Sequence, residues 1–314
     1  MSVIGVDIGY GVTKVIDSNG RVESFRSIVG AGVPNSLGLP RGQKLRTVKV
    51  GDATYTVGEE AETFSLPLIN VRQRNSIESI AYKALVLAAV GNDRSNGNED
   101  SRHFIITGLP VQFMNDFERL KNVYKSILPE AQIAVVPQPA GSFFDVLLDI
   151  EGRVKNDAYS KARIGVIDIG TYTTDFILFD KMEVVNGLSG TVTIGINSLT
   201  SQIIEACRDK RRSLSHIEAE EAITTGYIRR LNEQINVSDI VQKLKKQVAG
   251  NIWSYMNSLW GGDERIEQII LTGGGAAMFR DAFIQSNITA SPNGFLSNVV
   301  GFFKLGKRMH GQVN

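Results

Sequence analysis

The sequence predicts an α/β protein of two domains that are built on one repeated unit. The chain has 314 residues, which is enough for two ordinary domains. The stretch VIGVDIGYGVTK at residues 3–14 returns as IGVIDIGTYTTD at residues 164–175. The offset between Asp7 and Asp168 is 168 − 7 = 161 residues, about half of the chain. Each copy opens a series of strand, glycine turn, strand hairpin and helices, which indicates an internal duplication and not a short solenoid repeat.

The composition is that of a soluble globular protein, with 42% hydrophobic and 21% charged residues. Lys and Arg number 34 against 33 Asp and Glu, which argues against a dedicated nucleic-acid binder. The lone Cys207 can form neither an intramolecular disulfide nor a cysteine-rich metal site, and we expect it to be a small buried side chain on a helix. No signal peptide and no membrane-spanning apolar stretch is expected, so the expected compartment is the cytoplasm.

The first elements are expected to be strands and hairpins. The apolar, β-branched run Val3–Ile8 predicts a buried strand. Asn19-Gly20 stands between two alternating segments and predicts a hairpin, because both residues tolerate positive φ. The segment TVKVGDATYTVG predicts a second hairpin that turns near Gly51-Asp52.

Helices and strands then alternate to the end of the first half. Ser76–Val90 has helical spacing, with one apolar side formed by Ile77, Ile80, Ala84, Leu85 and Ala88. The polar stretch Gly91–Asp100 is expected to be a surface loop. After it we expect the strand HFIITGLP, the helix FMNDFERLKNVYKSI, the strand AQIAVVPQPAG running into a proline-rich turn, and the helix GSFFDVLLDI.

The polar segment EGRVKNDAYSKAR marks the junction between the halves. We therefore predict a first domain over residues 1–160, closed by a C-terminal helix at 297–314, and a second domain over 161–296. Inside the second domain we expect a strand at Ile164–Ile169, a hairpin of Thr173–Phe179 with Met182–Asn186, a helix at Ser198–Asp209 and the strand EQIILTGGG. A long helix is expected from Ser238 as N-cap, with an apolar stripe of Val241, Leu244, Val248, Ile252, Met256 and Leu259.

The phrase Asp-Ile-Gly at the end of a strand suits phosphate binding. Gly9 and Gly11 would let backbone N–H groups approach a phosphate without a Cβ in the way. The carboxylate of Asp7 could hold a hydrated Mg²⁺, and Lys14 could reach a β- or γ-phosphate. Taken alone, the phrase is better explained by a short strand before a tight turn than by a binding site, and no Walker sequence is present.

The second copy of the phrase favours the functional interpretation over the structural one. Asp168, Gly170 and the hydroxyls of Thr171 and Thr173 supply the same kinds of groups at the same offsets. A purely structural turn has no reason to return with its Asp and Thr at fixed spacing. Two such hairpins facing each other would clamp a triphosphate in a cleft between the domains.

Two further segments carry candidate site residues. Gly273–Gly275 follow a strand and precede a helix, where the backbone could pack against a flat ring or a phosphate, or could simply close a crowded junction. Gln138 follows a strand and is flanked by two prolines. Its carboxamide could position an attacking water, or it could be a solvated turn residue.

Together these segments resemble the actin-like ATPase superfamily of actin, heat-shock chaperone ATPases and sugar kinases. The order is that of the superfamily: first phosphate loop Asp7–Lys14, first connecting helix Gln138–Ser142, second phosphate loop Asp168–Asp175, adenosine loop Gly273–Gly275 and second connecting helix Asn298–Gly306. The resemblance implies a duplicated actin/hexokinase-like (ribonuclease H-like) fold that binds ATP or GTP with Mg²⁺ in the cleft between its domains. It implies Gln138, Asp168 and Asp7 as catalytic residues, the two Asp residues holding Mg²⁺ through water. The implied nucleotide-binding residues are Gly9, Tyr10, Gly11, Thr13, Lys14, Gly170, Thr171, Tyr172, Thr173, Gly195, Gly273, Gly274 and Gly275.

Within the superfamily the chain looks most similar to the ParM/StbA group of bacterial and archaeal actin-like filament proteins. The phrases FRSIVG, YTVGEEA, TGLPVQF and IGINSLTSQI carry this resemblance. It implies that Gly195 lines the cleft and that Glu218–Tyr227 lies near the base. Arg26 stands where a proline is common in the group, and the region between Asp209 and Ser238 does not map onto the group.

The group resemblance implies a nucleotide-dependent filament protein that hydrolyses its nucleotide and polymerises head-to-tail. Its expected partners are further copies of itself and a DNA-binding adaptor of a plasmid partition system, with no direct contact to nucleic acid or membrane. A small sugar or acid kinase of the same fold is the alternative, with Asp175 as candidate base. A chaperone-like ATPase would need an appended peptide-binding domain, for which no sequence remains after the second connecting helix.

Overall fold

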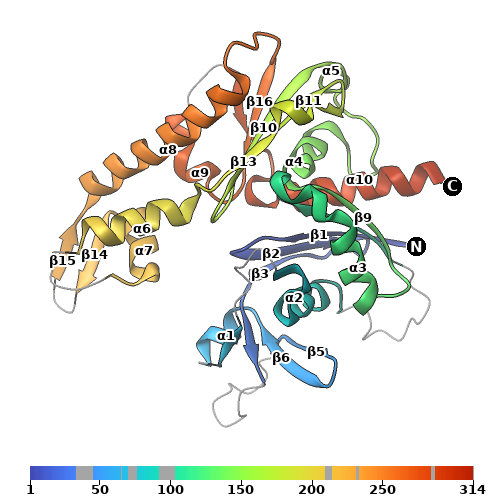
Figure 1. Ribbon diagram of the computed structural model, residues 1–314, viewed down its shortest axis with the longest axis horizontal. Coiled ribbons are helices and arrows are strands. Elements are labelled where there is room, and N and C mark those ends of the chain that lie inside the picture. The colour runs from blue at the N-terminus through green and yellow to red at the C-terminus, as the bar shows by residue number, and fades with distance from the viewer. Residues whose placement is uncertain are drawn as a thin grey trace. The chain divides into compact units, whose positions relative to one another are not determined.

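The computed structural model describes residues 1–32, 45–64, 66–69, 76–91, 103–208, 214–230, 233–283 and 287–313. The chain divides into two compact units (Figure 1). The first unit consists of Met1–Ser160 with Leu296–Asn314, and the second of Lys161–Phe295.

The first unit contains a five-stranded sheet of order β3-β2-β1-β8-β9. β1 pairs antiparallel with β2 and parallel with β8, because β1 and β2 form a hairpin whereas β8 returns after a helix. The strands are β1 Ser2–Ile8, β2 Val12–Asp17, β3 Val22–Arg26, β8 His103–Leu109 and β9 Gln132–Pro137.

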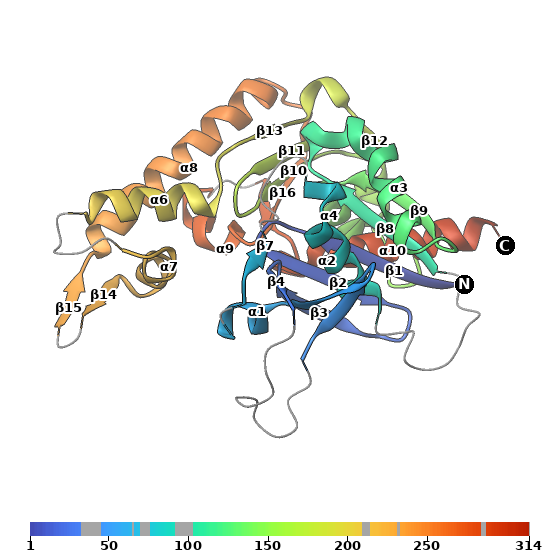
Figure 2. The same ribbon diagram turned by 60° about the horizontal axis from the view of Figure 1, so that its bottom comes forward.

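A smaller sheet of order β5-β6-β4-β7 belongs to the same unit, beside the short helix α1 Glu59–Thr63 (Figure 2). The expected hairpin at Gly51 is confirmed, with Gly51 at a φ of 60°. The strands are β4 Val29–Ala31, β5 Thr47–Val50, β6 Ala53–Val57 and β7 Leu68–Ile69.

Helix α2 spans Ile80–Val90 and begins later than predicted. Residues Ser76–Glu78 form a 3₁₀ turn, and the Ser79 side chain caps the helix by accepting from the N–H of Tyr82. The predicted apolar side was wrong at Ile80, which is 48% exposed. The helix is buried on nearly all sides, so one-sided spacing could not locate its exposed residues. Of the expected loop at residues 91–100, all but Gly91 lies outside the described residues.

Helix α4, Gln138–Leu147, corrects the predicted proline-rich turn. β9 ends at Pro137 and the helix starts at the next residue, because proline fits the first helical turn where its missing N–H is not needed. The helix also stops three residues before the predicted end at Ile150. The other helical segments are a 3₁₀ stretch Val111–Asp116, α3 Phe117–Ile127, α5 Asp157–Lys161 and α10 Ser297–Val313.

Helices α4 and α10 pack against each other with almost no side chain between them at one point. A Cβ added to Gly301 would lie 1.7 Å from the carbonyl oxygen of Gly141. Close by, the buried ammonium of Lys304 lies 2.6 Å from an Asp145 carboxylate oxygen. The backbone contact therefore requires glycine, and the ion pair fixes the register of the two helices.

The second unit repeats the sheet of the first. Its strand order is β12-β11-β10-β16-β17, again with an antiparallel hairpin on one side of the central strand and parallel strands on the other. β13 pairs with β11 outside this order. The strands are β10 Arg163–Ile169, β11 Thr174–Asp180, β12 Glu183–Val184, β13 Gly190–Val192, β16 Gln268–Thr272 and β17 Ile288–Ala290.

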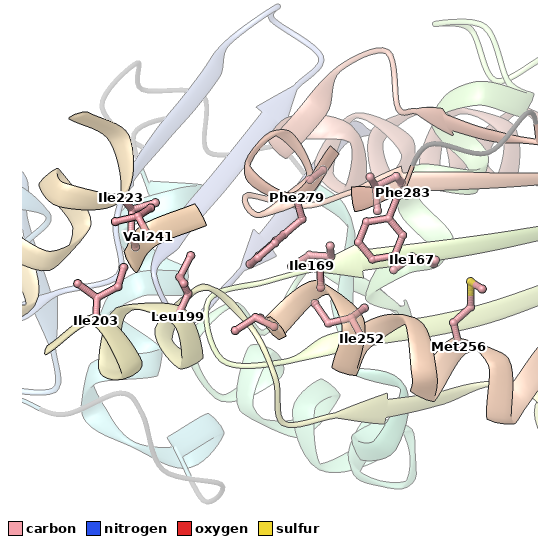
Figure 3. Close-up of a cluster of buried hydrophobic side chains, with 14 of the residues drawn as sticks. Ile167, Ile169, Leu199, Ile203, Ile223, Val241, Ile252, Met256, Phe279 and Phe283 are labelled. Atoms are coloured by element: carbon pink, nitrogen blue, oxygen red, sulfur yellow. The ribbon is translucent and has the colours of Figure 1, made fainter. Parts of the chain in front are cut away.

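The helices of the second unit bury one common core, part of which Figure 3 shows. The predicted stripe of α8 is confirmed, with Val241, Val248, Ile252 and Met256 in this core. Ser238 is the first residue of α8 and not its N-cap, because its hydroxyl donates to the carbonyl of Gly226 instead of accepting from the first helical turn. The elements are α6 Ile196–Ala206, α7 His216–Thr225, β14 Tyr227–Arg230, β15 Glu233–Asn236, α8 Ser238–Trp260, α9 Ala276–Phe279, and 3₁₀ turns at Asn186–Leu188, Arg280–Ala282 and Gly294–Leu296.

The Asn19-Gly20 hairpin is present, but its turn differs from the predicted one. Gly20 has a φ of 82°, whereas Asn19 keeps a negative φ. The loop closes through hydrogen bonds from the backbone N–H groups of Asn19 and Arg21 to the Asp17 carboxylate. A side-chain acceptor at Asp17 thus decides the turn, which the Asn-Gly pair alone did not reveal.

Candidate functional site

The first glycine turn joins β1 and β2, and it places Asp7 directly opposite Lys14 in the hairpin. The turn is closed by a hydrogen bond from the N–H of Gly9 to the carbonyl of Val12. Asp7 is 1% exposed, and one of its carboxylate oxygens lies 2.7 Å from the Lys14 ammonium. A buried carboxylate is thereby compensated by a cation, as burial of a charge requires.

Gln138 is brought to the same carboxylate from 131 residues away. Because α4 begins directly at the end of β9, its first side chain reaches β1 across the sheet. The Gln138 amide donates to the second oxygen of Asp7 at 2.8 Å. Both oxygens of Asp7 are therefore engaged, one by Lys14 and one by Gln138.

Ser27 supports this turn, although it was not among the site residues predicted from the sequence. Its hydroxyl donates to the carbonyl of Gly9 at 2.6 Å, and its N–H donates to the carbonyl of Gly11. Thr13 is fully buried and its hydroxyl lies 2.9 Å from that of Ser27. The Thr13 side chain thus supports the turn from within instead of facing a ligand.

The second glycine turn repeats the first residue by residue. Asp168 stands opposite Asp175 in the β10–β11 hairpin, as Asp7 stands opposite Lys14, and the offset of 161 holds for both members. The N–H of Gly170 donates to the carbonyl of Thr173, which matches the bond from Gly9 to Val12. The two turns therefore have one backbone design.

Their charges differ. In the second turn an Asp replaces the Lys, so two carboxylates stand opposite each other on one face of the hairpin. The hydroxyls of Thr173 and Thr191 donate to the two oxygens of Asp175. The first turn pairs its carboxylate internally, whereas the second concentrates negative charge and would attract a cation.

Gly195 lies against the second turn. The N–H groups of Ile196 and Asn197, at the start of α6, donate to the carbonyls of Gly170 and Thr171. A Cβ at Gly195 would lie 2.6 Å from the Gly170 carbonyl oxygen, so this contact requires glycine.

The three glycines after β16 do not serve one purpose. A Cβ at Gly273, whose φ is 89°, would lie 2.3 Å from a carboxylate oxygen of Asp168. A Cβ at Gly275 would lie 2.4 Å from the Ile169 side chain. A Cβ at Gly274 would meet only the end of the Ile196 side chain, at an ordinary 3.6 Å. Gly273 and Gly275 thus close a crowded junction, and Gly274 is the one of the three whose added Cβ would make no short contact.

A pocket opens beside the first glycine turn. Its walls are mostly apolar, and they are formed by Ile8, Gly9, Tyr10, Ile77, Tyr82, Leu85, Gly108, Leu109, Pro110, Phe113, Asp116 and Gln138. Burial, with Tyr124 and the Asp7 carboxylate as further causes, raises the pKa of Tyr82 well above its usual range. The Tyr82 hydroxyl therefore stays neutral where its side chain lines the pocket.

In each unit the carboxylate at the glycine turn fits a hydrated Mg²⁺ better than a protein-caged metal. Asp7 in the first unit and Asp168 in the second are each a hard oxygen donor at a strand end, the kind of ligand Mg²⁺ prefers while it keeps several waters. Lys14 and Gln138 already bind the oxygens of Asp7, which leaves contact through water as the natural arrangement. Within the described part of the chain, no group of three or more His, Cys, Asp or Glu side chains could hold a metal by itself.

The sequence-predicted residues thus fall into two sets, each described within its own unit. The first unit brings together Asp7, the glycine turn, Lys14 and Gln138. The second unit brings together Asp168, the turn Gly170–Thr173, Gly195 and Gly273. Ser27 and Tyr82 are the additions that sequence reasoning missed. Over the residues that the structure describes, no helix is both long and apolar enough for a bilayer span.

Comparison with protein families matches both halves of the chain. Residues 5–141 match the N-terminal domain of actin-like proteins, and residues 166–285 match the C-terminal part of the MreB-like archaeal actin homologues.

Three known proteins are similar over nearly the whole chain. An archaeal actin homologue of Thermoplasma volcanium is 24% identical over 303 residues, 90% of each chain. The subunit of a 15-stranded ParM filament from Clostridium botulinum is 22% identical, with a TM-score of 0.78 over 98% of this chain and 99% of that one. An archaeal actin homologue crystallised with ADP is 20% identical, with a TM-score of 0.74 over 100% of both chains.

The predicted fold class is confirmed by these full-length structural matches. With two family matches that together span both units, the chain belongs to the actin-like proteins.

Proposed function

We propose that this protein is a nucleotide-dependent, filament-forming ATPase. The observation that carries the proposal is the pair of glycine turns with identical hydrogen bonding and identical register. Each turn ends a central strand in a carboxylate, so each can offer backbone N–H groups to phosphate oxygens and a carboxylate to the water shell of Mg²⁺.

The roles follow from the contacts. Backbone N–H groups of the two turns bind phosphate oxygens, and Lys14 supplies positive charge beside them. Asp7 and Asp168 orient the water shell of the metal. Gln138, fixed by its bond to Asp7, orients the attacking water, and Gly274 gives the backbone access to the rest of the nucleotide. The similar chain crystallised with ADP supports a nucleotide as the ligand, and ATP or GTP is the proposed substrate.

Filament formation is supported by similar chains that are described as filaments. In our proposal the subunits contact one another head-to-tail, and the nucleotide state sets the strength of that contact. A role in plasmid segregation through a DNA-binding adaptor is the finer proposal. A small sugar or acid kinase is less well supported, because the candidate base Asp175 already accepts from two threonine hydroxyls.

The proposal is tested by assembly as a function of nucleotide. We expect a critical concentration at least tenfold lower with Mg-ATP or Mg-GTP than with the diphosphate, corresponding to a difference of about 1.4 kcal/mol per contact. Gln138→Ala is expected to bind the triphosphate normally, to hydrolyse it on the order of 10²–10³ times more slowly and to give longer-lived polymers. Sedimentation over a protein titration, with phosphate release measured in parallel, checks both results. A chain that stays in the supernatant well above micromolar concentration and phosphorylates a small hydroxylated substrate would establish the kinase alternative.

The glycine triplet gives a second test of the nucleotide site. Gly274→Ala is expected to change the free energy of unfolding by less than about 1 kcal/mol, because its Cβ would make only an ordinary contact, at 3.6 Å, with the Ile196 side chain. It should nevertheless weaken nucleotide binding by about tenfold or more, since a methyl group in a close contact costs at least about 1.4 kcal/mol. Gly273→Ala is the matched contrast and should destabilise the fold itself by about 2–4 kcal/mol. Thermal unfolding measures the effect on stability, and nucleotide titration measures the effect on binding. If Gly274→Ala and the unmodified chain bind the nucleotide with equal affinity, Gly274 is not part of the site.

A further inference from the structure

The turn between β11 and β12 has a backbone that its residues do not favour. Asp180 pairs with Glu183, which leaves Lys181 and Met182 as a two-residue turn with φ of 50° and 71°. In the described part of the chain these are the non-glycine residues with positive φ. Two-residue turns of this kind normally carry Asn-Gly, because a Cβ makes the left-handed conformation unfavourable.

The surrounding structure holds the turn in place. The N–H of Lys181 donates to the carbonyl of Ala162 at 3.1 Å. Arg163, which is nearly buried, pairs with Asp180 at 2.6 Å and with Asp263 at 2.8 Å. These contacts fix the strand ends on both sides, and none of them uses the side chain of Lys181 or Met182.

The turn also lies away from the nucleotide-binding residues. It joins the far end of β11, whereas Asp168 and Thr173 are at the opposite end of the same hairpin. Lys181 is exposed and Met182 is partly exposed. Backbone strain that persists without a structural need points to a use for the side chains, here a flexible apolar group beside a positive charge.

A surface with the complementary chemistry is present elsewhere in the same unit. Helix α7 turns Ala219, Ala222 and Ile223 toward the core, while Ile217 is 60% exposed. Glu220 and Glu221 are exposed on the same helix. Figure 1 draws α7 with β14 and β15 at one end of this unit, away from β10 and β11.

We propose that the Lys181-Met182 turn of one copy binds α7 of a second copy of this chain, with Met182 against Ile217 and Lys181 beside Glu220. Two different surfaces on one unit form a heterologous contact, and such a contact extends into an open polymer when its rotation does not close. The inference rests on the proposed filament function and names the residues of one subunit contact.

A variant that carries Asn-Gly, the pair that this turn backbone favours, distinguishes an effect on stability from an effect on assembly. Lys181→Asn with Met182→Gly is expected to raise Tm by roughly 5 °C, because the strain is relieved. The same variant is expected to raise the critical concentration in Mg-ATP by at least about tenfold. Lys181→Arg with Met182→Leu, which keeps a cation and an apolar group, is the control and should assemble at nearly the unmodified critical concentration.

A mixture of the turn variant with a variant of α7, Ile217→Ser, tests directly whether the turn binds α7. Ile217→Ser is expected to fold normally, because Ile217 is exposed, and to assemble poorly. The turn variant keeps α7 and the Ile217→Ser variant keeps the turn, so an equimolar mixture should form pairs that do not extend, seen by analytical ultracentrifugation.

Three results would overturn the inference. They are a turn variant that assembles like the unmodified chain, a turn variant with a lowered Tm, and a mixture with no pairs. Failure of the unmodified chain to assemble with any nucleotide would instead remove the filament function, and this inference with it.

Discussion

Asp7→Asn is expected to lower Mg²⁺-dependent nucleotide hydrolysis by on the order of 10²–10³-fold. The substitution keeps the shape of the side chain but removes the charge that would organise the metal shell. It also replaces one of the two acceptor oxygens by an NH2 group, so the Lys14 ammonium, 2.7 Å from Asp7, and the Gln138 amide can no longer both be held by this side chain. Metal, phosphate and water would therefore lose their alignment together.

Asp168→Asn is expected to act in the same direction, because Asp168 has the same place in the second turn. Asp52→Asn, in the exposed turn of β5 and β6, is the control and should leave hydrolysis unchanged. Phosphate release measured over a Mg²⁺ titration checks all three variants. Turnover like that of the unmodified chain in both Asp7→Asn and Asp168→Asn would show that these carboxylates do not organise the metal.

Gly301→Ala is expected to destabilise the protein by about 3 kcal/mol or more. The new methyl group would lie 1.7 Å from the Gly141 carbonyl oxygen and 2.9 Å from the backbone nitrogen of Asp145. These atoms belong to the backbone of a neighbouring helix and cannot rotate away. Helices α4 and α10 would have to separate, which would also loosen the buried pair of Lys304 with Asp145.

Gly250→Ala is the matched contrast, since Gly250 is an exposed residue in the middle of α8 with nothing within 4 Å of its added Cβ. There the same substitution should stabilise by up to about 1 kcal/mol, because alanine favours the helix. Denaturant unfolding measures both free energies. Equal stability of the Gly301→Ala and unmodified proteins would contradict the close packing of α4 on α10.

Local patterns in the sequence determined the repeated elements. The 161-residue offset of the Asp-Ile-Gly phrases predicted two strands with the same turn, and the hairpins have matching registers at Asp7 and Asp168. The apolar stripe of α8 was also read correctly. These features depend on residues close together in the chain, because the helix period of 3.6 residues and the strand period of two determine which neighbouring side chains share a face.

Tertiary structure alone decided which distant residues meet. Gln138 could be named as a candidate, but its bond to Asp7 depends on β9 ending at the right edge of the sheet. Ser27 and Tyr82 gave no signal, because a serine or a tyrosine becomes part of a site only through its neighbours in space.

Thr13, in contrast, was predicted as a site residue from its place in a motif. In the fold its side chain is buried against Ser27. The left-handed turn at Lys181-Met182 likewise contradicts local preference and exists because the flanking strands and ion pairs impose it. The sequence by itself therefore determined the elements, the duplication and the motif positions of this protein. The partners of each side chain were decided by packing, because contact energies act between residues that are neighbours in space and not in the chain.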